Sequence, residues 1–220
     1  MLILASSSPR RRALLRAAGV EFRAIAPRAE EIPSTASGRY AHLVKQAALR
    51  KAREVARRHA AAKAKLSRAA SVGGSRCGSF APALVLGADT IVVCAGEIMG
   101  KPRDEADARR MLRKLSGRWH SVYTGVALVA GSRELLASER TEVAFRRLSK
   151  DEIERYLATG EPMGKAGAYA IQGRGAALVR SVRGCYTNVI GLPVPRVLEM
   201  LQQCGVGARK GARDARPARR

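Results

Sequence analysis

Apolar positions recur along the chain with two different spacings. Short apolar runs bounded by polar residues or glycine are typical of strands, whereas apolar positions three or four residues apart are typical of helices. We predict strands at residues 2–5, 83–86, 91–93, 122–129, 135–145, 169–171 and 176–182. We predict helices at residues 9–18, 40–59, 104–115, 151–157 and 193–203. These elements interleave without an internal repeat, which favours an α/β or mixed α+β fold in one domain.

Local signals mark where two of the helices begin. Ser8 and Pro9 are residue types preferred at the N-cap and the first helical position, and Gly19 is placed to end that helix. Ser149 and Glu152 have the spacing of a capping box. Residues 60–80 are rich in Ala, Lys, Ser, Gly and Arg, so we expect a frayed helix end and a flexible surface insertion there.

Composition is ordinary except for charge. The chain has 220 residues, enough for one substantial core, and 46% of them are hydrophobic. It has 41 Lys and Arg against 18 Asp and Glu, and the net charge of +23 favours anionic partners, either nucleic acid or nucleotides. Part of the excess lies in residues 205–220, which we expect to form a disordered basic tail after a domain of residues 1–204.

Cysteine usage and the N-terminus bear on the compartment. The four cysteines are far apart and form no C-x-x-C pair, so neither a zinc knuckle nor a disulfide framework is indicated. The first apolar run, residues 1–5, is too short for a signal peptide or a membrane span. We therefore expect a cytoplasmic protein with no membrane partner.

The segment before the first predicted helix places cations where a helix is already positive. Ser6, Ser7 and Ser8 precede Arg10, Arg11 and Arg12, which fall in the first turn. Free backbone N–H groups, serine hydroxyls and guanidinium groups together suit a polyphosphate. The alternative is a solvated basic turn.

Other polar residues are candidates for chemistry. Asp89 follows the apolar run 84–86, so we predict it at a strand end, where a carboxylate could bind a metal or activate water. Glu31 could supply a second carboxylate for Mg²⁺ or Mn²⁺, and Lys101 could reach a phosphate. The amide of Gln172 could read a base edge. Each of these residues could instead be structural or merely solvated.

Several motifs in order carry a family resemblance. The chain resembles the Maf family of nucleoside triphosphate pyrophosphatases from about Leu2 to Leu201. The segments that match are Leu4-Ala5-Ser6, Ser8-Pro9-Arg10-Arg11, Gly87-Ala88-Asp89-Thr90, Gly100-Lys101-Pro102, Leu115-Ser116-Gly117, Tyr123-Thr124-Gly125, Lys165-Ala166-Gly167-Ala168-Tyr169, Ile171-Gln172-Gly173 and Gly191-Leu192-Pro193.

The resemblance implies a twisted mixed sheet in two lobes with a central cleft, and a homodimer. It implies metal-dependent hydrolysis of a nucleoside triphosphate to the monophosphate and pyrophosphate, which would remove non-standard or excess nucleotides. Carried over by position, Asp89 is the base that activates water and, with Glu31, contacts the metal. The residues carried over as substrate contacts are Ser6, Ser8, Arg10, Arg11, Lys51, Thr90, Lys101 and Gln172.

The combination of Arg10, Thr90 and Gln172 resembles the branch that acts on dTTP and UTP. Gln172 could pair with the O4 and N3 edge of thymine or uracil. The alternatives are the 7-methyl-GTP branch of the family, a relative that has lost turnover, and a basic nucleic-acid-binding protein without catalysis. Gly164, where the family usually has an acidic residue, and the long segment 60–80 are departures from the pattern. The basic tail could add nonspecific nucleic-acid binding.

Overall fold

A computed structural model describes residues 1–29, 32, 38–70 and 83–205, without the side chains of 65–70. The strands are β1 (Leu2–Ala5), β2 (Phe22–Ile25), β3 (Leu84–Cys94), β4 (Glu97–Met99), β5 (Trp119–Ala130), β6 (Arg133–Phe145) and β7 (Val179–Arg183). The helices are α1 (Pro9–Ala17), α2 (Tyr40–Ala70), α3 (Glu105–Leu115), α4 (Lys150–Leu157), α5 (Tyr186–Ile190) and α6 (Val194–Gln203). Two 3₁₀ segments, η2 (Ala166–Ala168) and η3 (Gly173–Leu178), lie between α4 and β7.

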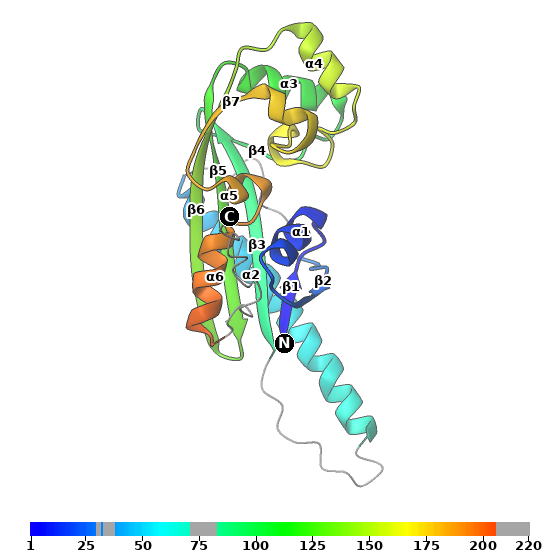
Figure 1. The fold of residues 1–220 in the computed structure, drawn as a ribbon. Helices are drawn as coiled ribbons and strands as arrows, with labels where there is room; N and C mark the ends of the chain where they lie inside the picture. Colours follow the sequence, from blue (N-terminus) through cyan, green and yellow to red (C-terminus); the bar gives the residue numbers. More distant parts are fainter. Residues whose placement is uncertain (30–31, 33–37, 71–82, 206–220) are drawn as a thin grey trace, which may run out of the picture.

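All the described strands belong to one mixed sheet, which confirms the predicted fold class. The strand order is β2-β1-β3-β5-β6-β7, and β4 pairs with the end of β3. β1 is parallel to both of its neighbours, whereas the long strands β3, β5 and β6 form an antiparallel meander. The meander extends beyond β1 toward α3 and α4 (Figure 1).

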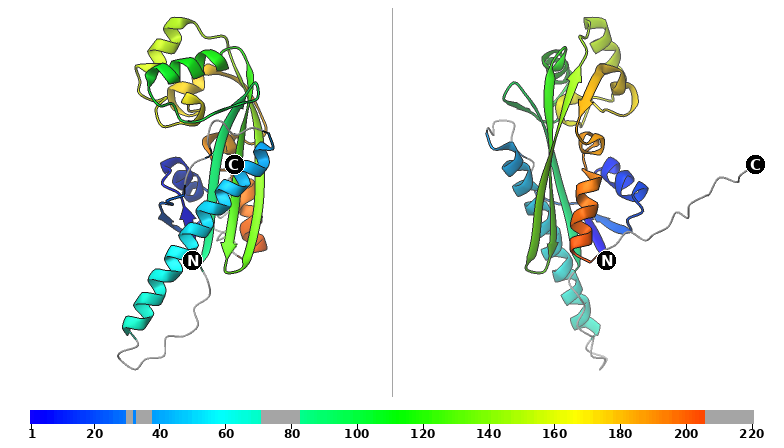
Figure 2. Two further views of the ribbon diagram at one scale, coloured as in Figure 1. Left: turned by 180° about the vertical axis from the view of Figure 1, so that it is seen from behind. Right: turned by 60° about the vertical axis from the view of Figure 1, so that its left-hand side comes forward.

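The two faces of the sheet bury different helices. Side chains alternate along a strand, so Leu2 and Leu4 face α1 and α6, while Ile3 and Ala5 face α2. Helix α2 crosses the sheet on the far side from α6, as the two views of Figure 2 show. A strand covered on both faces has no polar side, which is why β1 is apolar throughout.

Two glycines let α2 lie directly on the sheet. A Cβ atom at Gly87 would stand 2.2 Å from the carbonyl oxygen of Ala48, and one at Gly125 would stand 2.2 Å from that of Val44. Both distances are far below van der Waals contact, so only glycine permits this approach. The crossing fixes which turn of α2 faces the middle of β3.

A second lobe covers the far end of the meander. Its core joins α3 and α4 to the ends of β3, β5 and β6 through residues such as Leu112, Phe145 and Tyr156. In Figure 1 this lobe lies at the opposite end of the long strands from the N-terminus. The first lobe, built on β1, α1 and α6, and the second lobe therefore share one sheet.

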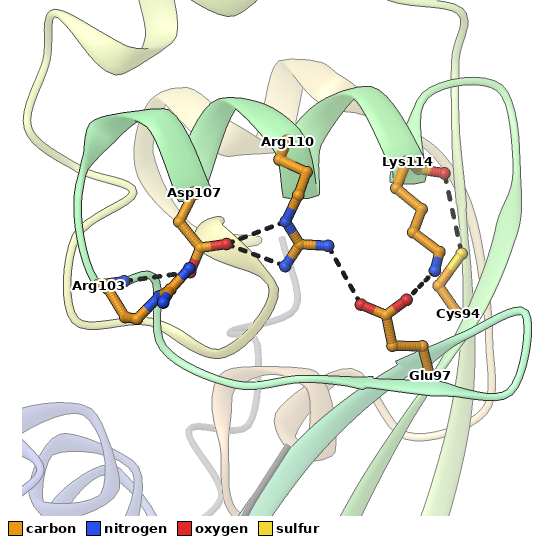
Figure 3. Close-up of polar contacts among 6 residues, drawn as sticks. All are labelled: Cys94, Glu97, Arg103, Asp107, Arg110 and Lys114. Atoms are coloured by element: carbon orange, nitrogen blue, oxygen red, sulfur yellow. Dashed lines mark hydrogen bonds and ion pairs between the residues drawn. The ribbon is translucent and has the colours of Figure 1, made fainter. Parts of the chain in front are cut away.

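Ion pairs on the surface join α3 to the β3–β4 hairpin. Arg110 contacts both Asp107 and Glu97, and Lys114 also pairs with Glu97 (Figure 3). The hydrogen bonds from Lys114 and Arg110 hold the pKa of Glu97 below its usual value. These contacts fix the hairpin that leads into Gly100 and Lys101.

Several local predictions are confirmed and others are wrong. The Ser8 hydroxyl caps α1, and Ser149 with Glu152 forms the capping box of α4. Helix α2 does not end at residue 59 but continues to Ala70, because its Ala, Lys and Arg residues are strong helix formers. The strand predicted at 169–171 is absent, because the chain there turns between η2 and η3, and residues 176–178 belong to η3. Residues 71–80 of the predicted insertion and 206–220 of the tail lie outside the described residues.

One correction concerns Asp89. Residues 83–86 and 91–93 are not separate strands, since β3 is continuous from Leu84 to Cys94 and Asp89 lies in its middle. The strand that ends nearby is β1, whose last residue, Ala5, pairs with Gly87. Asp89 is therefore at a sheet edge because its neighbour stops, and not because its own strand does.

Candidate active site

A gap in strand pairing opens a cavity on one side of β3. β1 pairs with β3 only as far as Gly87, and β4 pairs only from Val92 onward. Residues 88–91 therefore have no strand partner on that side within the described sheet. A cavity of about 500 Å³ lies here, between the turn that precedes α1 and the loop from Met163 to Ala166 of the second lobe.

The serine-rich turn forms the first wall of the cavity. Ser6, Ser7 and Ser8 all line it, together with Arg10 and Arg11 of α1. The Ser6 hydroxyl accepts a hydrogen bond from the backbone N–H of Ser8 at 3.1 Å, which folds the turn back toward the end of β1. This wall combines a helix N-terminus with hydroxyl groups and cations, an arrangement suited to anions.

Arg11 ties the cavity walls together. Its guanidinium donates to the carbonyl oxygens of Ala88 at 2.9 Å and Gly191 at 2.8 Å, and to the Thr90 hydroxyl at 2.9 Å. Ala88 belongs to the segment of β3 that pairs with β5 but has no strand partner on the cavity side, so Arg11 supplies a donor that a neighbouring strand would have supplied there. Arg11 thus has protein acceptors in the cavity wall, and its role as a phosphate contact stays a prediction.

A buried ion pair lies at the centre of the cavity wall. Lys51 extends from the turn of α2 that follows Ala48, and its ammonium donates to Oδ1 of Asp89. The relative exposure of each of these side chains is 9%. Asp89 is the only carboxylate among the described residues that line the cavity, and its Oδ2 has no hydrogen-bond partner within the described chain. That oxygen can accept a proton from a molecule in the cavity.

The second lobe contributes a wall fixed by Glu161. Its carboxylate accepts from the Tyr156 hydroxyl at 2.9 Å and from the backbone N–H groups of Arg174 at 3.1 Å and Gly175 at 2.9 Å. Burial raises the pKa of Glu161, but the Gly175 and Tyr156 hydrogen bonds outweigh it, so the pKa lies below its usual value. Glu161 is therefore an anchored anion, and its backbone carbonyl accepts from the Lys165 ammonium.

An aromatic cluster supports this wall from behind. Tyr169 lines the cavity, and its hydroxyl lies 2.8 Å from Nε2 of the buried His120. Phe145 packs edge-on against both rings. Burial lowers the pKa of His120 to about 4, so its imidazole is neutral near pH 7. The cluster is a rigid, uncharged backing and supplies no cation to the cavity.

Most of the predicted site residues meet at this cavity. The residues in its lining are Ser6, Ser8, Arg10, Arg11, Lys51, Asp89, Thr90 and Lys101. Gln172 is not in the lining, because it is exposed and lies directly before η3. Glu31 lies outside the described residues. Sequence reasoning missed Lys165 and Tyr169, although both belong to a segment that carried the family resemblance.

The donor set is compatible with a hard divalent cation bound together with a substrate. Mg²⁺ is usually held by one or two carboxylates while phosphate oxygens and water complete its shell. Within the described ranges no three His, Cys, Asp or Glu side chains gather into a cluster, and Asp89 is the one carboxylate that faces the cavity. A phosphate-bearing substrate would have to complete such a site.

The fold and the cavity define a two-lobed mixed α/β protein with a basic cleft, in which Asp89 is the one carboxylate among the described lining residues, suited to a phosphorylated ligand. Residues 1–204 match the family model described as Maf-like protein. The chain is 50% identical to a dTTP/UTP pyrophosphatase of Symbiobacterium thermophilum, over 93% of this chain and 94% of that protein. The chain belongs to the Maf family.

Further relatives agree. Proteins named dTTP/UTP pyrophosphatase from Moorella thermoacetica and Pelotomaculum thermopropionicum are 49% and 46% identical, over 93% of this chain and 95% and 96% of theirs. A solved structure, that of the Staphylococcus aureus Ham1 protein, aligns with 66% of this chain and 71% of its own at 13% identity and a TM-score of 0.37, too low to support an argument. No helix in the described part of the chain is long and apolar enough to cross a lipid bilayer.

Proposed function

We propose that this chain is a nucleoside triphosphate pyrophosphatase that converts dTTP and UTP to the monophosphate and pyrophosphate. The observation that carries the proposal is Asp89, the one carboxylate among the described residues of the lining, in the same cavity as several cations and hydroxyl groups. The relatives named for this activity, at 46 to 50% identity over most of both chains, supply the choice of substrates.

Asp89 acts as the general base in the proposed reaction. Its Oδ2 accepts a proton from a water molecule while the water oxygen forms a bond to the α-phosphorus. The bond from the α-phosphorus to the bridging oxygen breaks, and its electron pair leaves with pyrophosphate. Lys51 donates to Oδ1, which orients the carboxylate and leaves Oδ2 toward the cavity. A base must lie within hydrogen-bond reach of the proton it removes, so the attacking water would have to bind next to Oδ2 in this cavity.

The cationic lining stabilises the charge that develops on the leaving group. Attack at the α-phosphorus transfers charge to the pyrophosphate oxygens, and preorganised donors aimed at that charge lower the barrier. Backbone N–H groups at the start of α1 and the side chains of Arg10 and Lys101 are the groups proposed for this role. Positioning the triphosphate between two walls also removes the entropic cost of bringing water and phosphorus together.

We also propose that the reaction depends on Mg²⁺ or Mn²⁺. Asp89 would hold the ion together with phosphate oxygens, and Glu31 remains the proposed second carboxylate. When bound, the ion would neutralise phosphate charge and act as a Lewis acid. Measuring turnover across a range of Mg²⁺ and Mn²⁺ concentrations, with a chelator as the reference, tests this dependence.

A panel of triphosphates tests the proposed activity. Pyrophosphate release is measured for dTTP, UTP, 7-methyl-GTP, dCTP and dATP in the presence of Mg²⁺ or Mn²⁺. We expect dTTP and UTP to be the best substrates and Asp89→Asn to lose at least ~100-fold in kcat. Asp151→Asn, an exposed carboxylate at the start of α4, is the matched control and should remain fully active. Preference for 7-methyl-GTP would move the chain to the other branch, and activity in Asp89→Asn equal to wild type would refute the assigned base.

Assembly is a separate proposal. We propose a homodimer on the strength of the family resemblance, and light scattering at several protein concentrations distinguishes a dimer from a monomer. Nonspecific attraction of nucleic acid by the basic tail predicted at residues 205–220 is tested by comparing duplex DNA binding with and without these residues at low and high salt.

A further inference from the structure

The cations that line the cavity differ in how many of their hydrogen-bond donors the protein already uses. Arg11 donates to four protein acceptors, and Lys51 is paired with Asp89. Arg10, by contrast, makes no hydrogen bond or ion pair with any described residue although it is partly buried. Its five N–H donors are therefore available to a ligand.

Lys165 is the second cation with donors to spare. Its ammonium donates to the backbone carbonyl of Glu161, the one acceptor it has among the described residues. An ammonium has three donors, so two remain for a molecule in the cavity. Lys165 lines the same cavity as Arg10 but comes from the second lobe, on the loop that follows Glu161.

Arg10 and Lys165 line the same cavity and are near enough to repel each other. Burial is the main cause that lowers the pKa of each, and the positive charge of Arg10 lowers the pKa of Lys165 further. Glu161 attracts both, yet its carboxylate is occupied by Tyr156 and two backbone N–H groups. Two partly desolvated cations that repel each other are a cost to the empty protein, which a shared anion would relieve.

We propose that Arg10 and Lys165 bind one phosphate group from opposite walls of the cavity, and that Glu161 positions Lys165 for this contact. The ligand class is a di- or triphosphate, and the inference that it is part of a nucleotide rests on the proposed function. The two walls belong to different lobes, so the shared phosphate links the lobes across the cleft.

Binding of inorganic pyrophosphate, measured by calorimetry, tests this site without requiring turnover. We expect Lys165→Met to weaken pyrophosphate binding about 10- to 100-fold, the usual range for a hydrogen bond to a charged group. Lys165→Arg keeps the charge and should recover most of the lost affinity. Lys150→Met is the matched control, because Lys150 is an exposed lysine of the same lobe with no partner in the described chain. This variant should bind pyrophosphate as wild type does.

A double-mutant cycle distinguishes one shared phosphate from two independent contacts. If Arg10 and Lys165 hold the same group, Arg10→Gln combined with Lys165→Met loses less affinity than the product of the two single effects. The melting temperature of each variant and its affinity for thymidine, which carries no phosphate, report whether the cavity stays intact.

The outcomes separate clearly. Loss of pyrophosphate binding in Lys165→Met, with melting temperature and thymidine binding unchanged, supports the inference. Wild-type affinity in Lys165→Met, or parallel losses of stability and of both ligands, overturns it and leaves Lys165 as a structural residue. A wild-type protein that binds pyrophosphate through Lys165 but hydrolyses no triphosphate would contradict the proposed function alone.

Discussion

Replacing Lys51 by methionine breaks a buried ion pair. It should destabilise the protein much more than the loss of an ion pair on the surface would. The substitution leaves Asp89 in the cavity wall, with an exposure of 9%, next to an apolar side chain. Breaking a buried pair by removing one partner costs about 3 to 5 kcal/mol, because an uncompensated charge remains. Cavity water reaches part of the carboxylate, so we expect about 3 kcal/mol, or a fall in melting temperature of roughly 6 to 12 °C.

The same variant combined with Asp89→Asn separates this cost from loss of packing. The double variant has no buried charge, so it should be more stable than Lys51→Met alone, with a coupling energy of about 2 kcal/mol. Arg53→Met is the matched control, because Arg53 lies on the same helix and pairs with Glu134 on the surface. An exposed pair contributes about 0 to 1 kcal/mol.

Urea unfolding of wild type, Lys51→Met, Asp89→Asn, the double variant and Arg53→Met gives these free energies directly. If Lys51→Met costs no more than Arg53→Met, or if the effects of Lys51→Met and Asp89→Asn simply add, then the pair is not the buried charge couple described above. That result would also remove the physical reason for Lys51 to orient Asp89.

Three further comparisons of variants test other parts of the structure. Gly87→Ala should prevent α2 from packing on the sheet, and should either abolish folding or lower the free energy of unfolding by more than ~4 kcal/mol. Gly100→Ala, where the added Cβ has open space, should lower it by less than ~1 kcal/mol. Urea unfolding measures both. Arg11→Met should lower the free energy of unfolding by about 2 to 3 kcal/mol by leaving carbonyl groups without donors, whereas Arg10→Met should raise KM and change stability by less than ~1 kcal/mol. Because the pKa of His120 falls from 6.5 to about 4 on folding, its neutral form is favoured in the native state, and stability is lost as pH drops from about 6.5 toward 4. Wild type should therefore lose about 2 to 3 kcal/mol more than His120→Gln between pH 7 and pH 4.5.

Contrary results would be equally informative. Equal stability of the two alanine variants would mean that α2 does not approach the sheet at Gly87. Equal stability loss in Arg10→Met and Arg11→Met would remove the distinction between a ligand contact and a structural tie. An identical pH dependence in His120→Gln would place the acid sensitivity elsewhere.

Local structure was predictable where a few neighbouring residues decide it. The cap at Ser8 and the capping box at Ser149 depend on side chains that reach only three residues along the chain. The end of the first helix at Gly19 is similarly local, since its φ of 70° suits glycine. These features followed from residue type and spacing alone.

The errors arose where distant segments decide the structure. Gly87 looks like a strand terminator in the sequence, but it is there to admit the backbone of α2, and β3 continues through it. The protein contacts of Arg11 are equally distant, because its acceptors at Ala88 and Gly191 lie 77 and 180 residues away in sequence. Neither relation has a signature in local hydrophobicity or charge.

Hydrolysis of dTTP in water enriched in oxygen-18 tests the central claim most directly. Mass spectrometry of the two products locates the labelled oxygen and so identifies the phosphorus atom that water attacks. Attack at the α-phosphorus, with Asp89 as the base, predicts that the label enters dTMP and that pyrophosphate remains unlabelled. Label in pyrophosphate, or release of inorganic phosphate and dTDP, would contradict it.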